Sequence, residues 1–137
     1  MKRFALMAAL IVVLAGCATG ITRMKGESAA ERYEPYLGAP IEQFTAFHFN
    51  GWESVARNQV VVWTGVNEAY LLTVWGTCTD LNYAHRIGIT STGNTVNRLE
   101  SLRVGRERCP IEEIRPIDVA GYKADRAAAR EQATRQS

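Results

Sequence analysis

The chain has 137 residues and carries 16 Lys and Arg against 14 Asp and Glu, which gives a net charge of +2. This basic excess is the only hint of a nucleic-acid partner, because nucleic-acid binding depends on a positive surface. The length suits one domain around one hydrophobic core, and no segment recurs at the spacing of about 20 to 50 residues that repeat proteins show.

The first sixteen residues have the organisation of an export signal. Lys2 and Arg3 form a short positive region, and the uncharged apolar run FALMAALIVVL occupies residues 4–14. A helix of this length measures about 16 Å, about half the hydrocarbon thickness of a bilayer, so it is too short to span one. We therefore expect residues 1–16 to be a signal peptide that is removed.

The residues that follow, Leu14-Ala15-Gly16-Cys17, resemble the lipobox of bacterial lipoproteins, in which the cysteine becomes the lipidated N-terminus. The alternative is an ordinary signal peptide with a chance cysteine. Each buried CH₂ of an acyl chain contributes about 0.8 kcal/mol, so two or more chains anchor a protein stably without a transmembrane helix. An Asp after the cysteine would favour the inner membrane, and Ala18 instead favours the outer membrane.

Cleavage before Cys17 also removes Lys2 and Arg3 and leaves 14 basic against 14 acidic residues, so the mature chain is neutral. We expect a protein of the cell envelope, attached to the outer membrane by lipid on Cys17 and facing the periplasm. Its partner would be an unknown envelope protein or ligand, and not nucleic acid.

Assigning Cys17 to lipid leaves Cys78 and Cys109 as an even pair in an oxidising compartment. A disulfide is the favoured interpretation, and closing a loop of about 32 residues stabilises a fold by about 3 to 4 kcal/mol. One alternative is a redox pair, although such pairs usually follow the spacing C-x-x-C. The other is a metal site, although no familiar zinc spacing is present; its further ligands would be His48, His85 or Asp80.

Residues 17–40 are expected to be the lipidated N-terminus and a tether without regular structure. Small and charged residues dominate this segment, and three residues that disfavour regular structure interrupt it. These are Pro35, Gly38 and Pro40. The apolar side chains of Tyr33, Tyr36 and Leu37 indicate that its last part docks onto the folded domain.

Residues 41–118 are expected to form a β-rich domain. The aromatic segment 44–49 predicts an opening strand that leads into a turn at Gly51-Trp52. The β-branched run 59–64 is typical of a strand covered on both faces. A turn at 65–68 joins it to a returning strand at 69–75, so the two form a central hairpin.

The second half of this domain has weaker patterns. Four elements are predicted here: a single helical turn within 78–84, strands over 85–90 and 96–104, and a turn at 91–94 between the strands. Because Pro110 and Pro116 cannot donate ladder hydrogen bonds, residues 110–117 are predicted to be a short edge strand or an extended flank.

Residues 119–137 contain strong helix formers and no proline, so they predict a C-terminal helix. Its apolar face is thin, and Arg126 and Arg130 lie four residues apart, which is mildly repulsive. We expect the helix to fray beyond residue 130 and to be solvated; the alternative is an interaction role for this charged tail. The predicted fold class is α+β: a mainly antiparallel sheet of five to six strands with a C-terminal helix and one disulfide.

Several features occur together in this chain: the lipobox, Gly51-Trp52, Val60–Thr64, Ala69–Leu72, Cys78, Ile87–Ser91 and Cys109-Pro-Ile-Glu-Glu-Ile. In this combination they resemble a family of small proteobacterial lipoproteins of unknown function. The likeness covers about residues 38–118. It implies a class and a location, and it brings no known activity.

Candidate chemistry is sparse. The chain has no G-x-S-x-G, no H-E-x-x-H and no glycine-rich phosphate loop, and Glu112 and Glu113 point to opposite faces of a strand. His48, between Phe47 and Phe49, is expected on the opposite face of the opening strand and exposed to solvent. His85, near Cys78 and Asp80, is the better candidate for ligand binding, although an ordinary surface role is the commoner one for a histidine.

The three tryptophans, Trp52, Trp63 and Trp75, could line a ligand groove, but at least two of them are expected in the core.

We therefore expect a non-enzymatic envelope interaction module that needs no cofactor and no metal, with no catalytic residue. The alternative is a lipoprotein that binds a small ligand or a metal through His85 and Asp80. A hydrolase is a distant third, because it would need a Ser or Cys nucleophile beside a histidine.

Overall fold

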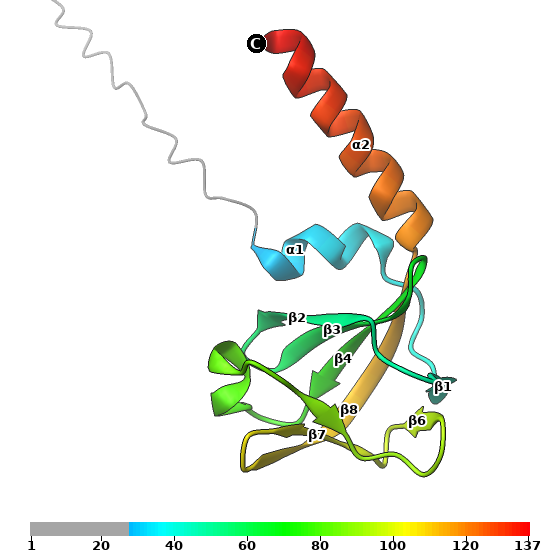
Figure 1. The fold of residues 1–137 in the computed structure, drawn as a ribbon, viewed down its shortest axis with the longest axis vertical. Helices are drawn as coiled ribbons and strands as arrows, with labels where there is room; N and C mark the ends of the chain where they lie inside the picture. The colour runs from blue at the N-terminus through cyan, green and yellow to red at the C-terminus, as the bar shows by residue number, and fades with distance from the viewer. Residues whose placement is uncertain (1–27) are drawn as a thin grey trace, which may run out of the picture.

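The computed structural model describes residues 28–137, so the predicted signal peptide and Cys17 lie outside the described residues. A six-stranded sheet forms the body of the molecule, and every neighbouring pair of strands is antiparallel (Figure 1). In spatial order the strands are β2 (Gly51–Ala56), β3 (Gln59–Gly65), β4 (Glu68–Val74), β8 (Glu107–Ile117), β7 (Ser101–Val104) and β5 (Gly88–Ile89).

The remaining elements lie around this sheet. A separate pair joins β1 (Gln43–Thr45) to β6 (Thr95–Asn97). The helices are α1 (Ala29–Tyr33), the 3₁₀ turns η1 (Glu34–Tyr36) and η2 (Thr79–Tyr83), and α2 (Val119–Gln136). The predicted α+β class, with a C-terminal helix that begins at residue 119, is confirmed.

The two faces of the sheet bury different clusters because side chains alternate along each strand. We call the cluster on one face the inner core. It comprises Phe44, Val60, Val62, Leu72, Val74, Cys78, Leu81, Val96, Leu102, Val104, Cys109, Ile111 and Ile114. Residues from both ends of the strand order pack against this one cluster, among them Trp52 of β2 and Ile89 of β5. The sheet therefore curls around the inner core.

The opposite face buries a smaller cluster, here called the outer core, under α1, η1 and the start of α2. It comprises Tyr33, Val55, Val61, Ala69, Leu71, Ile117 and Val119. The predicted hairpin supplies both cores: Val60 and Val62 face inward, Val61 faces outward, and all three are at most 1% exposed. The prediction of a central β3–β4 hairpin with both faces covered is thus confirmed.

Strand β8 corrects the prediction of an edge strand at 110–117, because it lies inside the sheet between β4 and β7. Its prolines are tolerated because the backbone N of each one points away from the strand with which it pairs. Pro116 pairs with β4, and Pro110 pairs with β7. The carbonyl of Pro116 accepts from Gly38 N at 2.8 Å, and that of Pro110 accepts from Trp75 N at 2.9 Å. In an extended strand the N and the carbonyl of one residue point the same way, so neither proline removes a bond from its paired neighbour, β4 or β7.

Two other strand predictions are also corrected. Residues 96–104 form two strands in different sheets, because Asn97 makes a turn: its Oδ1 accepts from Leu99 N at 2.8 Å, and its carbonyl accepts from Glu100 N at 3.1 Å. The opening strand is confined to β1, and residues 46–50 lie outside any strand. Gly51 and Trp52 begin β2 rather than a turn.

In the second half, the helical turn predicted within 78–84 is confirmed as η2. The strand expected over 85–90 contracts to Gly88–Ile89.

The segment expected to lack regular structure is partly helical. Ser28 and Glu31 form a reciprocal capping box that starts α1, and Pro35 occupies the first turn of η1, where its missing N–H costs nothing. The docking expected of Tyr33, Tyr36 and Leu37 is observed, since all three belong to the outer core or pack on it. The prolines do not prevent this helical structure, because Pro35 lies in the first turn of η1 and Pro40 lies after η1, outside any helix or strand.

Helix α2 continues to Gln136 instead of fraying at 130. The side chain of Asp118 caps its start by accepting from Gly121 N at 3.0 Å, and Arg135 pairs with Glu131 at 2.6 Å near its end. From Lys123 onward every residue of α2 is exposed. Among the described residues, no helix is long and apolar enough to cross a membrane.

Candidate functional site

The two edges of the curled sheet, β2 and β5, line one cleft. Each is the last strand of its side, so each has a strand neighbour on one side only within residues 28–137. The cleft has a volume of about 210 Å³. Its apolar lining consists of Phe49, Trp52, Val62, Ile87 and Ile89, and its polar lining of Asn50, His85 and Arg86, with Gly51 and Gly88 between them.

The cleft has an apolar floor and a polar rim. Val62 is 1% exposed, and Trp52, Ile87 and Ile89 pack against the inner core, so these side chains cannot move away without disturbing it. Phe49 is 43% exposed, and His85 and Arg86 are exposed as well. The arrangement suits an apolar group that enters between the two edges while polar groups meet it at the mouth.

A second, more open hollow adjoins the cleft and shares His85 and Arg86 with it. Its volume is about 380 Å³, and its other lining residues include Asp80, Tyr83 and Gly105. The structure thus brings His85 and Asp80, the two predicted ligand-binding residues, to one hollow, where both are exposed. Asp80 is positioned by its backbone, whose N donates to Glu107 Oε2 at 3.0 Å.

The disulfide predicted between Cys78 and Cys109 is present, with Sγ atoms 2.04 Å apart and Cα atoms 5.9 Å apart. Both cysteines are buried, and the bond joins the start of η2 to β8. Within residues 28–137, Glu107 and these two cysteines are the only group of three potential metal ligands within mutual reach. Because the sulfurs are bonded to each other, they offer no thiolate to a metal.

The other residues considered from the sequence lie elsewhere. His48 is exposed in the irregular segment 46–50 and does not line the cleft. Trp63 packs on the outer core, and Trp75 is 63% exposed. Trp52 alone of the three tryptophans lines the cleft. At least two tryptophans were expected in the core; Trp52 and Trp63 are partly buried and pack against the inner and the outer core.

Sequence reasoning missed Phe49, Arg86 and Ile87 as parts of one site. They come from two segments far apart in the chain, which meet because the sheet curls. Exposed aromatic residues beside a strand were the available signal, but no spacing rule connects residue 49 to residue 86.

The chain belongs to a family of unknown function, DUF6491, whose model matches residues 1–133. No match was found among curated proteins, and none among solved structures.

Proposed function

We propose that this family member is a lipid-anchored, non-enzymatic binding module of the bacterial envelope. In this proposal residues 1–16 direct export, lipid on Cys17 holds the chain on the outer membrane, and the cleft between β2 and β5 binds an extended segment of a partner protein in the periplasm. The basic start, apolar run and lipobox support the proposed location in the envelope. The cleft supports the activity.

The size of the cleft is the observation that carries this proposal. Pockets for small-molecule ligands have volumes of about 300 to 1,000 Å³ and bury most of the ligand. A cleft of about 210 Å³ is smaller than that, and its apolar floor suits one or two side chains of a larger partner. The small-ligand alternative is therefore less well supported by this cleft than the docking of a protein segment.

The two sheet edges favour an extended segment over a helix. The outer backbone groups of an edge strand are available to a further strand, and several domains bind peptides by adding one. A segment beside β2 or β5 would place alternate side chains in the cleft. Arg86 on the rim favours an acidic residue next to the apolar one, because an ionised carboxylate hydrogen-bonds strongly to a guanidinium.

The lining of the cleft also supports the absence of catalysis. It includes no Ser, Cys, Asp or Glu that could act as a nucleophile beside His85. The open hollow with Asp80 and His85 has a volume within the range of small-ligand sites, and it favours the second candidate, a small-ligand-binding lipoprotein. Ligand-dependent melting with added divalent cations tests that candidate, and an unchanged melting temperature counts against metal binding there.

Cell fractionation tests the proposed membrane attachment through Cys17. The wild-type chain is expected with the membranes, and its N-terminal peptide should show the mass of a diacylglyceryl cysteine. Cys17→Ser should move the protein to the soluble periplasmic fraction, because the acyl chains are then absent. Membrane association that survives Cys17→Ser contradicts lipid anchoring at that residue.

Photocrosslinking in intact cells tests the activity. A photoreactive residue placed at 85 is expected to give a discrete protein adduct, and one placed at Arg106, in the β7–β8 turn, is the exposed control. Arg86→Glu should reduce the adduct at least about tenfold, because it reverses the charge at the rim. A peptide from the crosslinked region should then shift the NMR amide signals of β2 and β5. Equal adducts at both positions contradict docking in the cleft.

A further inference from the structure

We propose that the helical end of the molecule rests on an anionic lipid surface through an arginine face. This face is formed by Arg32 of α1 together with Arg126 and Arg130 of α2, which line a groove of about 370 Å³ between the two helices. The inference rests on the lipid anchor proposed above, and it adds a contact that the anchor alone does not require.

The charge of this face is unbalanced. Three arginines line the groove, of which Arg32 is paired with Glu53. The acidic residue among the lining side chains is Asp125, which accepts from the Tyr36 hydroxyl at 2.6 Å. No carboxylate in the part of the chain that the structure describes forms an ion pair with Arg126 or Arg130. Two like charges four residues apart destabilise a helix slightly, so an external anion would relieve a repulsion that already exists.

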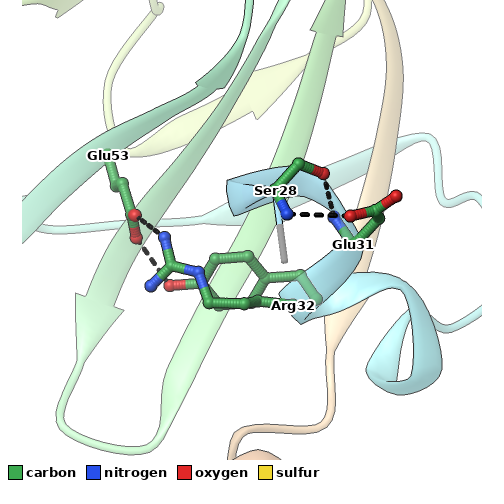
Figure 2. A network of polar contacts seen from close by, with 5 residues as sticks. Ser28, Glu31, Arg32 and Glu53 are labelled. Carbon is green, nitrogen blue, oxygen red and sulfur yellow. Dashed lines mark hydrogen bonds and ion pairs between the residues drawn. The ribbon is translucent and has the colours of Figure 1, made fainter. Parts of the chain in front are cut away.

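Figure 2 shows how Arg32 is held. Its guanidinium forms an ion pair with Glu53 of β2, which also accepts from the Tyr33 hydroxyl at 2.7 Å. Burial and then the hydrogen bond to Glu53 raise the pKa of Tyr33, so the hydroxyl remains a neutral donor. Although burial lowers the pKa of Arg32, the bond to Glu53 and its charge outweigh that effect and raise it. The α1 side of the groove is thus fixed to the sheet.

The α2 side of the groove is fixed to the domain by the first turns of the helix. The ring of Tyr122 stacks on Tyr33 with centroids 5.0 Å apart and meets Tyr36 edge-on at 5.5 Å. Lys123 donates to the carbonyl of Val66 and to Asn67 Oδ1. These contacts set the direction in which α2 leaves the domain. The guanidinium of Arg126 lies 5.6 Å from the centre of the Tyr122 ring.

The position of the anchor brings this end to the bilayer. The described chain begins at Ser28, next to α1, and α1 and α2 lie at the same end of the molecule (Figure 1). Ten residues separate Cys17 from Ser28, so the eleven steps between the two Cα atoms span at most about 40 Å when fully extended. Helix α2 is about 27 Å long. A lipid on Cys17 therefore keeps the arginine face within reach of the headgroups.

The chemistry of α2 indicates surface contact rather than insertion. Beyond Tyr122 its apolar residues are alanines, so the exposed part of the helix has no face to bury in hydrocarbon. An arginine near an anionic surface favours binding about fivefold. Arg126 and Arg130 together should thus favour the bound orientation about 25-fold, once the anchor supplies a high local concentration.

Hydrogen exchange on vesicles tests this inference. The mature chain is coupled through the Cys17 thiol to a maleimide lipid, so the result does not depend on lipidation in cells. On vesicles of phosphatidylglycerol and phosphatidylethanolamine, amides in residues 119–136 should exchange about 25-fold more slowly than on phosphatidylcholine vesicles. Inorganic phosphate added to phosphatidylcholine vesicles should give no protection.

Two charge-reversal variants complete the experiment. Arg126→Glu with Arg130→Glu should abolish the lipid-dependent protection. Arg106→Glu with Arg108→Glu makes the same change of charge in the β7–β8 turn and the start of β8, at the other end of the molecule, and should retain it (Figure 1). Protection that is absent, independent of lipid charge, or unaffected by the first variant overturns the inference. Absence of lipid on Cys17 in cells would instead overturn the anchor.

Discussion

The inner and outer cores lie on opposite faces of one sheet, and they are built differently. The inner core contains aliphatic side chains, one phenylalanine and the disulfide, and nearly all of them are less than 4% exposed. The outer core is smaller, and its cover depends on tyrosine rings and on the bond between Arg32 and Glu53. The inner core therefore carries most of the stability of the sheet and the cleft. The outer core positions the helices.

Adjacent leucines of β4 give the largest expected effect and test this contrast directly. Leu72 is fully buried in the inner core, and Leu71, on the opposite face, is 5% exposed in the outer core. We expect Leu72→Ala to lower the free energy of unfolding by about 4 kcal/mol and Leu71→Ala by about 2 to 3 kcal/mol, because the looser site relaxes more. Urea unfolding measures both, and equal losses would contradict the contrast.

Removing the disulfide should have the next largest effect. Cys78→Ala with Cys109→Ala is expected to lower the free energy of unfolding by about 3 kcal/mol, since the unfolded chain gains freedom. The wild-type chain unfolded in the presence of a reductant should show a similar loss. Hydrogen exchange of α2 should remain unchanged, because the bond lies in the inner core; faster exchange there would mean that the two cores are coupled.

Loss of the Tyr122 ring should separate the helices from the sheet. Tyr122→Ala removes contacts with Tyr33 and Tyr36, so we expect a loss of about 2 kcal/mol. Amides of α2 should exchange faster while those of β3 and β4 stay protected. Arg135→Ala, near the exposed end of α2, serves as the control and should change stability by less than about 0.5 kcal/mol.

The smallest effect at neutral pH concerns Tyr70, whose ring stacks on Phe44 of the inner core at 4.1 Å. Burial and then the hydrogen bond to Glu68 raise the pKa of Tyr70 to about 12 from 10.0. Between these values the folded state binds more protons than the unfolded state, so stability falls as pH rises from 10 to about 12. Tyr70→Phe should make that fall shallower in urea unfolding; an unchanged slope would assign it to other groups.

The sequence predicted the elements whose signals are local. The run Gln59–Thr64 and the alternating residues after it specified the hairpin, and the helix formers after Asp118 specified α2. Pro110 misled the prediction of β8, because whether a missing N–H matters depends on which neighbour it faces. That neighbour is known only from the register of the whole sheet.

The candidate site was predicted only in part, for the same reason. Asp80 and His85 are close in the chain, so their meeting at one hollow was foreseeable. Phe49 and Ile87 meet because the inner core draws both edges of the sheet around it. Closure of that kind is a property of the packed core, and it leaves no periodicity in either segment.

The disulfide has a further consequence if the chain is exported as proposed. Cys78 immediately precedes η2, the turn that leads into the rim residues His85 and Arg86, and its bond to Cys109 ties this turn to β8. Such a bond forms in an oxidising compartment and not in the reducing cytosol. In the export route proposed above, this bond would form only after translocation, and until then η2 and β8 would not be joined covalently.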